Sequence, residues 1–222
     1  MTALPLSAAD AWVDWEWIGE HQDVILGALA QHVELTAIAV GVGLLLALPA
    51  GLLAWRVEGA RGALLAGAGA LYTIPSLALF AFFVPFTGLS VVTAEIGLVG
   101  YTLLILIRNV VVGLAGVPYE VRDAALGMGY RPLRRLLRVD LPLALPVIIA
   151  GVRIATVTTI GLVTITAVIG EGGLGQLILD GLNRQFKTPL VVGGVLSVAL
   201  AVLADLALAG LQRRLTPWRR TA

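Results

Sequence analysis

Long, almost uninterrupted blocks of apolar residues restrict the fold of this chain more than any other feature. Hydrophobic residues make up 59% of the 222 positions and charged residues only 13%, with a mean hydropathy of +0.95. A soluble domain is about half apolar and about a quarter charged. A helix that crosses the hydrocarbon core needs about 20 mainly apolar residues, and several blocks reach that length. The sequence therefore predicts an all-α, multi-pass protein of the cell membrane.

Five blocks have the length and composition of membrane spans. They cover approximately residues 33–55, 62–86, 96–114, 143–169 and 190–211. The second block contains Pro75 and Pro85, and a proline inside a span kinks or breaks its helix because a backbone carbonyl loses its partner. Pro75, with Ser76 beside it, is thus either a plain kink or part of the gate of a transport pathway.

The basic residues indicate the orientation of the spans. Eleven of the 15 lie in the segments that share one side of the membrane if five spans alternate. Basic loops face the cytoplasm, which predicts an outer N-terminus and an inner C-terminus. The eleven are Arg56, Arg61, Arg122, Arg131, Arg134, Arg135, Arg138, Arg213, Arg214, Arg219 and Arg220.

Three regions follow from this topology. Residues 1–32 are expected to form an outer interfacial segment, because acidic residues alternate there with Trp12, Trp15 and Trp17, and tryptophan favours the headgroup level. Residues 33–212 would form the transmembrane domain and residues 213–222 a basic cytoplasmic tail. His21 and His32 precede the first block and are expected to be polar interfacial residues.

Several classes of function are excluded or disfavoured. A net charge of +1 argues against nucleic acid as a partner, and the absence of cysteine excludes Cys-based metal sites. The phosphate-loop pattern G-x-x-x-x-G-K-[S/T] does not occur, so we expect no nucleotide cofactor on this chain, no metal and no ATP hydrolysis. The chain also lacks two matching halves, which disfavours a self-contained secondary transporter.

Ionisable and glycine-rich positions supply further candidates. Arg153 and Asp205 lie within predicted spans, where charged groups are either functional or paired with each other. Both are therefore candidates for a pathway, together with Pro75 and Ser76. The run from Gly170 to Gly175 is expected to form a tight outer turn or a re-entrant segment rather than a phosphate cradle.

The polar segment of residues 118–142 shows a helix–turn–helix pattern. Pro118 suits the first turn of a helix, where its missing N–H has no cost. Glu120 and Asp123 place negative charge near the positive end of that helix. Gly129 permits a sharp turn, and Pro132 can start a second short helix. The predicted motif would lie on the cytoplasmic surface.

The spacing in this segment resembles the EAA loop of ABC importer permeases. That loop has Glu-Ala-Ala, three residues, Gly, nine residues, Ile, one residue and Leu-Pro. Here Asp123-Ala124-Ala125 is followed at the same intervals by Gly129, Val139 and Leu141-Pro142. The resemblance implies that the segment docks on a separate ATPase subunit and transmits its movement to the spans. The implied coupling residues are Glu120, Arg122, Asp123, Ala124, Ala125, Gly129, Arg131, Leu141 and Pro142.

Other motifs are similar to the permeases of osmoprotectant importers, which carry glycine betaine, choline, carnitine or proline. The matching stretches are Ile74–Phe80, Arg108-Asn109, Leu141–Pro146, Ala150–Arg153 and Gly170–Gly175. The resemblance implies the type I (methionine-importer-like) permease fold. It also implies two copies of an ATPase that holds Mg-ATP, a second permease subunit of the same or a related kind, and an extracytoplasmic binding protein. Two alternatives remain: an importer of methionine or another amino acid, and an autonomous channel or secondary carrier.

Overall fold

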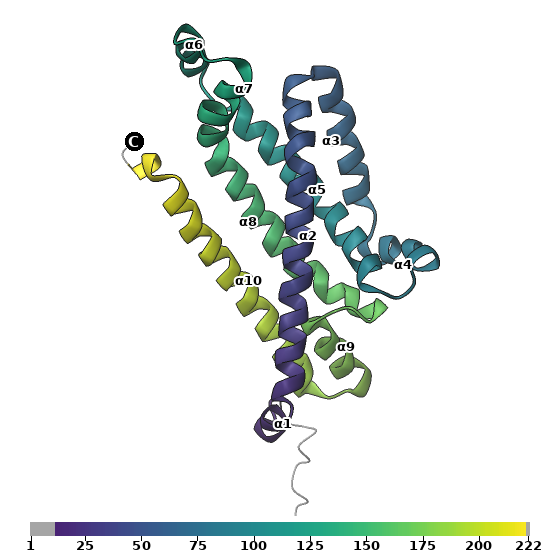
Figure 1. The fold of residues 1–222 in the computed structure, drawn as a ribbon. Helices are drawn as coiled ribbons and strands as arrows, with labels where there is room; N and C mark the ends of the chain where they lie inside the picture. The colour runs from purple at the N-terminus through teal and green to yellow at the C-terminus, as the bar shows by residue number, and fades with distance from the viewer. Residues whose placement is uncertain (1–11, 221–222) are drawn as a thin grey trace, which may run out of the picture. The chain divides into compact units, whose positions relative to one another are not determined.

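The computed structural model describes residues 12–220, with side chains up to Trp218, and these residues form helices and no strands (Figure 1). The predicted segments 1–32 and 213–222 therefore lie partly outside the described residues. The helices are α1 (Trp15–Glu20), α2 (Gln22–Arg56), α3 (Glu58–Thr73), α4 (Ser76–Thr87), α5 (Val91–Ala115), α6 (Tyr119–Gly127), α7 (Pro132–Arg135), the π-helical turn η2 (Leu136–Asp140), α8 (Leu141–Ile165), the 3-10 turn η3 (Thr166–Ile169), α9 (Leu174–Arg184), α10 (Lys187–Leu215) and the 3-10 turn η4 (Pro217–Arg220).

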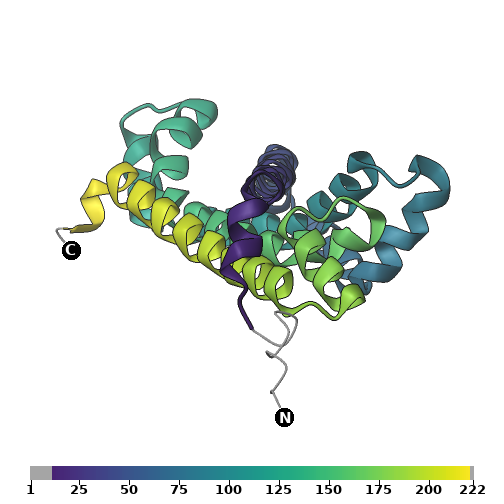
Figure 2. The same ribbon diagram turned by 90° about the horizontal axis from the view of Figure 1, so that it is seen from below.

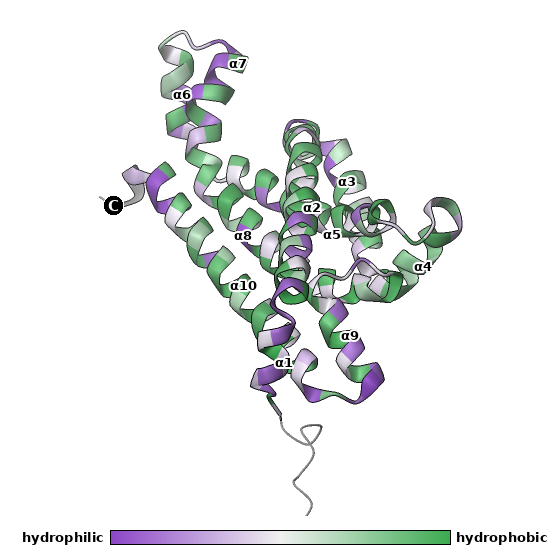
Figure 3. Ribbon diagram, turned by 60° about the horizontal axis from the view of Figure 1, so that its bottom comes forward, coloured by the Kyte–Doolittle hydropathy of each residue, from purple (hydrophilic) through white to green (hydrophobic). Residues whose placement is uncertain are grey.

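Four helical runs within residues 12–220 are long and apolar enough to cross a membrane. They are α2, α5, the run Pro132–Ile169 that contains α8, and α10; α3 and α4 pass the same test only together and would make a fifth span. Hydrophobic colours accordingly run along α2, α8 and α10, whereas α7 carries hydrophilic residues (Figure 3). The prediction of an all-α multi-pass membrane protein is confirmed, and the five predicted spans correspond to these four helical runs and the bent pair α3–α4.

The chain divides into two compact units. The first contains Met1–Ala39, Pro75–Leu98 and Val157–Leu203, and the second contains Val40–Ile74, Val99–Thr156 and Ala204–Ala222. The long helices α2, α5, α8 and α10 thus each contribute to both units.

In the first unit, α9 runs alongside the beginning of α10 (Figure 2). Glycines make this approach possible: a Cβ atom on Gly193 would lie 2.7 Å from the carbonyl oxygen of Leu174, and one on Gly181 would lie 2.7 Å from the backbone nitrogen of Leu190. Small residues at such contacts let helix backbones come close in membranes. The sequence analysis did not anticipate α9 as a helix.

The first unit also corrects the interpretation of His32, and its first long helix extends beyond the predicted span. Helix α2 begins at Gln22 rather than near Val33. His32 was expected to be an interfacial polar residue, but it is fully buried, and its Nε2 atom lies 3.0 Å from the carbonyl oxygen of Ile160. A buried imidazole can satisfy a backbone carbonyl in this way, so its polarity did not keep it at the surface.

The second unit has a core of small and branched side chains. A cluster of Ala47, Ala54, Ala68, Leu106, Ile107, Val111 and Ala155 joins α2, α3, α5 and α8. Helices α5 and α8 approach closely where Gly151 faces Asn109, because a Cβ on Gly151 would lie 2.4 Å from the Cβ of Asn109. Two motifs noted separately in the sequence, Arg108-Asn109 and Ala150–Arg153, therefore meet in space.

Candidate functional site

Residues 118–142 form α6, a tight turn, α7 and η2, all within the second unit, and η2 continues directly into α8. Pro118 is the residue just before α6, with an extended ψ of 143°, rather than part of its first turn. Pro132 occupies the start of α7, as expected. The segment therefore has the predicted helix–turn–helix form, with a π-helical turn that the sequence did not indicate.

Gly129 makes the turn between the two short helices. Its φ of +78° lies in the left-handed region, which glycine adopts without a steric penalty. The N–H of Gly129 donates to the carbonyl of Leu126 at 2.9 Å, and the N–H of Tyr130 donates to the carbonyl of Ala125 at 3.1 Å. These two bonds form a Schellman motif, which satisfies carbonyls at the end of α6. The backbone at this position therefore strongly favours glycine.

The outer surface of α6 and α7 combines charged and apolar side chains. Glu120, Asp123 and Ala124 are exposed, whereas Ala125 is only 1% exposed and faces the rest of the unit. Tyr119, Leu126, Met128 and Leu133 are also exposed. Tyr119 and Leu126 lie seven residues apart and so share one face of α6. A contiguous apolar patch rimmed by polar side chains marks a contact with another protein, so this face of α6 is a candidate contact surface.

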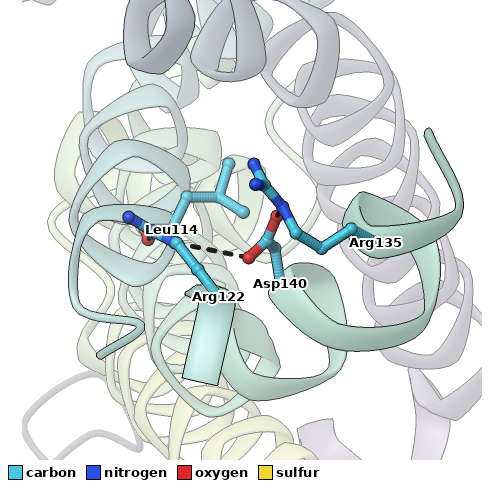
Figure 4. A network of polar contacts seen from close by, with 4 residues as sticks. All are labelled: Leu114, Arg122, Arg135 and Asp140. Carbon is cyan, nitrogen blue, oxygen red and sulfur yellow. Dashed lines mark hydrogen bonds and ion pairs between the residues drawn. The ribbon is translucent and has the colours of Figure 1, made fainter. Parts of the chain in front are cut away.

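A carboxylate beneath α6 and α7 connects the two helices. Asp140, the last residue of η2, has no exposed side-chain surface, and its two oxygens bind two different arginines (Figure 4). The Nε atom of Arg122 in α6 lies 3.4 Å from Oδ1, and that of Arg135 in α7 lies 3.2 Å from Oδ2. A buried carboxylate requires such partners because removal from water is costly. We call Arg122, Asp140 and Arg135 the Asp140 clamp.

Arg122 extends the clamp to two further helices. Its Nη2 donates a hydrogen bond to the carbonyl oxygen of Leu114, at the end of α5. Its guanidinium also lies 5.2 Å from the ring centre of Trp55, near the end of α2. One side chain of α6 thereby contacts α2, α5 and the approach to α8. Leu141 and Pro142 begin α8 and are half-buried, and Leu141 packs on the core that contains Leu114 and Leu136.

Sequence reasoning did not single out Asp140, and the reason is specific. Asp140 occupies the one unspecified residue between Val139 and Leu141 in the loop pattern, so the pattern assigned it no role. One signal was present, because Asp140 is the sole acidic residue between Asp123 and Glu171 and lies close to several arginines. An isolated carboxylate in a basic stretch predicts an ion pair but does not identify which arginine supplies it.

The pathway candidates Arg153 and Asp205 bind each other. The Nε and Nη2 atoms of Arg153 each lie 2.8 Å from an oxygen of Asp205, and Nη1 lies 3.3 Å from Oε1 of Gln212. Gln212 in turn donates to the carbonyl of Pro146 at 2.9 Å. Arg153, Asp205 and Gln212 line a cavity of about 380 Å³ together with Arg213 and others of α10. Of the two alternatives left open by the sequence, the structure shows the pairing of the two charges; a transport role stays a prediction.

Pro75 breaks the helix as expected. Ile74 and Pro75 have extended ψ angles of 129° and 132°, between the end of α3 and the beginning of α4 at Ser76. The hydroxyl of Tyr101 donates a hydrogen bond to the carbonyl of Ile74. A backbone group released at a break in a span needs such a partner, so the break is a stable part of the fold.

The glycine-rich run forms a tight turn, with φ values of +85° at Gly170 and +51° at Gly173. Gln31 holds it from α2: its Nε2 donates to Oε2 of Glu171 at 2.8 Å, and its Oε1 accepts from the N–H of Gly173 at 3.0 Å. Among the described residues, no group of three or more His, Cys, Asp or Glu could hold a metal ion.

Comparisons with known proteins match most of the chain. The family model described as "Binding-protein-dependent transport system inner membrane component" covers residues 39–217. The choline transport system permease protein OpuBB of Bacillus subtilis is 38% identical over 188 residues, which are 84% of this chain and 86% of that protein. The glycine betaine/carnitine/choline transport system permease protein OpuCB of Bacillus subtilis is 35% identical over 194 residues, 87% and 89% of the two chains.

A solved structure shows the same fold. A chain of the MetNI methionine ABC transporter in an inward-facing conformation superimposes with a TM-score of 0.79, covering 89% of this chain and 98% of that one. The two sequences are 21% identical, so this likeness is one of architecture.

Proposed function

The chain belongs to the family of binding-protein-dependent transport system inner membrane components, and on this premise we propose that it carries a compatible solute with a quaternary ammonium group. As a multi-pass permease subunit of an ABC importer, it resides in the inner membrane. The solute proposal rests on its relatives, whose names specify choline and glycine betaine/carnitine/choline transport. Import of methionine or another amino acid is the weaker alternative, because the methionine transporter shares the fold at only 21% identity.

The family and the form of the coupling segment support a set of partners. We propose that α6 and the Gly129 turn dock on a separate ATPase subunit, present in two copies, which binds and hydrolyses Mg-ATP. The exposed Asp123 and Ala124 would contact it directly, with Glu120 and Arg131 nearby. A second permease subunit would complete the pathway, and an extracytoplasmic binding protein would deliver the solute. This arrangement requires α6 to face the cytoplasm and the N-terminus to lie outside, with a transmembrane domain at 33–212.

The observation that carries the coupling role is the geometry at Gly129. A left-handed glycine fixes the angle between two short helices and supports an exposed surface of small, apolar and charged side chains. In the proposed importer this surface is the contact with the ATPase. An autonomous channel or secondary carrier would therefore be insensitive to changes in it.

The test is uptake of radiolabelled glycine betaine and choline into proteoliposomes that hold the full complex, with binding protein outside and ATP inside. Gly129→Asp is the variant, because the left-handed backbone and the added charge both oppose docking. Gly59→Asp is the matched control, since Gly59 is exposed in the first turn of α3, has no atom near its missing side chain and has no positive φ.

We expect uptake to require both ATP and the binding protein, to be lost in Gly129→Asp and to persist in Gly59→Asp. Uptake that continues without ATP, or that responds equally to both substitutions, would refute an ATP-coupled importer. Uptake of labelled methionine with no uptake of either quaternary amine would refute the proposed solute while leaving the coupling mechanism in place.

A further inference from the structure

The coupling helix α6 has few side-chain contacts of its own with the rest of the second unit. Ala125 is its buried residue and Arg122 its half-buried one, whereas the remaining residues of α6 are exposed. At its two ends the chain passes through turns, one ahead of Pro118 and one at Gly129. A short helix held in this way needs an additional fixed point if a push on it is to move the spans.

The Asp140 clamp supplies that fixed point. Asp140 is completely buried, and each of its oxygens is bound by an arginine from a different short helix. Because a buried carboxylate without partners is strongly unfavourable, the three side chains favour a single arrangement. Arg122 adds the carbonyl of Leu114 in α5 and the ring of Trp55 in α2, so α6 is connected through one guanidinium to the ends of two spans.

The π-helical turn η2 explains how Arg135 of α7 reaches Asp140. Arg135 and Asp140 are five residues apart, and the N–H of Leu141 donates to the carbonyl of Leu136, also five residues away. In an α-helix the neighbours on one face are three or four residues apart. The i to i+5 bonding of a π-helix brings residues at this wider spacing together, and such turns are frequent at functional sites. The turn thereby places Asp140, just before the beginning of α8, within reach of Arg135 at the end of α7.

We infer that Asp140 is a positioning residue for energy coupling: it makes α6, α7 and the ends of α2, α5 and α8 move as one body when an ATPase subunit displaces α6. This inference rests on the proposed ATP-driven function. Asp140 touches neither solute nor nucleotide; it acts through Arg122 and Arg135. In this mechanism the contact that transmits the movement is made by Asp140, the residue that the loop pattern leaves unspecified just before Leu141-Pro142.

The experiment measures molecules of solute taken up per ATP hydrolysed, in proteoliposomes with the complete complex and the binding protein. Asp140→Asn keeps the shape of the side chain but removes the charge that both arginines neutralise. Arg122→Lys keeps the charge but lacks the planar fork that reaches Asp140 and Leu114 together. Arg138→Gln is the control, because Arg138 belongs to the same basic segment, is exposed and is not part of the clamp.

We expect the uptake-to-hydrolysis ratio to fall about fivefold or more in Asp140→Asn and in Arg122→Lys; this factor lies at the lower end of coupling effects between two sites. In Arg138→Gln the ratio should stay at the wild-type value. Arg122 is partly exposed, so Arg122→Lys reports the ratio even if Asp140→Asn fails to assemble. Wild-type ratios in both clamp variants, or an equal loss in Arg138→Gln, would overturn the inference. A wild-type complex without ATP-driven uptake would instead overturn the proposed function.

Discussion

Replacing Gly151 by alanine is expected to force α5 and α8 apart. The new Cβ would lie 2.4 Å from the Cβ and 2.6 Å from the Cγ of Asn109, whereas carbons in contact lie about 3.5–4.0 Å apart. Rotation of the Asn109 side chain does not remove the clash, because its Cβ is fixed to the backbone of α5. A gap of roughly 1 Å must therefore open between the two helices.

The expected loss of stability follows from two opposing effects. Overpacking a close contact costs about 1–3 kcal/mol, and replacing glycine by alanine inside a helix returns about 1 kcal/mol. The difference is about 0–2 kcal/mol, and we expect the upper half of that range, about 1–2 kcal/mol, because a carbon–carbon contact of 2.4 Å is far shorter than van der Waals contact. For a chain of this length, 1 kcal/mol corresponds to about 2–4 °C in Tm, so we expect Tm to fall by about 2–8 °C.

Gly161→Ala is the matched control on the same helix. No atom lies within 4 Å of the Cβ it would add, so the gain in helix propensity is unopposed and Tm should rise by up to about 4 °C. The assay is thermal unfolding of the purified permease in detergent, followed by the loss of the monodisperse peak in size-exclusion chromatography. A Gly151→Ala variant as stable as wild type, or a Gly161→Ala variant that loses as much stability, would refute the packing argument.

Three further predictions concern other parts of the chain. Asp205→Leu leaves Arg153 without its carboxylate and should lower Tm, whereas the double variant with Arg153→Leu should regain most of the loss; a double variant less stable than Asp205→Leu would contradict the pairing. Tyr101→Phe removes the hydroxyl that donates a hydrogen bond to the carbonyl of Ile74 and should lower the free energy of unfolding by about 1 kcal/mol, measured by the same thermal assay. An unchanged Tm would show that another donor replaces the hydroxyl. The natural chain has no cysteine, so Met128→Cys should react with a membrane-impermeant maleimide only from the cytoplasmic side of oriented vesicles, and labelling from outside would reverse the proposed topology.

The membrane class, the approximate spans and the helix–turn–helix segment could be predicted from the sequence. They depend on properties that a short stretch of chain carries by itself: enough apolar residues to cross the hydrocarbon core, a proline that starts α7, and a glycine at the end of α6. In lipid the backbone must satisfy its own hydrogen bonds, so an apolar stretch of sufficient length has little choice but to form a helix. The burial of His32 was predicted wrongly, because a polar ring can enter the core where a backbone carbonyl, here that of Ile160, hydrogen-bonds to it. Helix α2 begins at Gln22 and is longer than the predicted span.

The partners of the charged side chains were decided by the tertiary structure. Arg122 and Asp140 are 18 positions apart and Arg153 and Asp205 are 52 apart, and several other arginines could have paired with either carboxylate on sequence grounds. The contact between Asn109 and Gly151 likewise exists only because α5 and α8 cross at those residues. Hydropathy and turn preference depend on residues that are close together in the sequence. The choice of an ionic or steric partner depends instead on which helices pack together and at which register. The sequence alone therefore determined the helix–turn–helix form of residues 118–142, and only the packing of α2, α5 and α8 decided which contacts hold that segment in place.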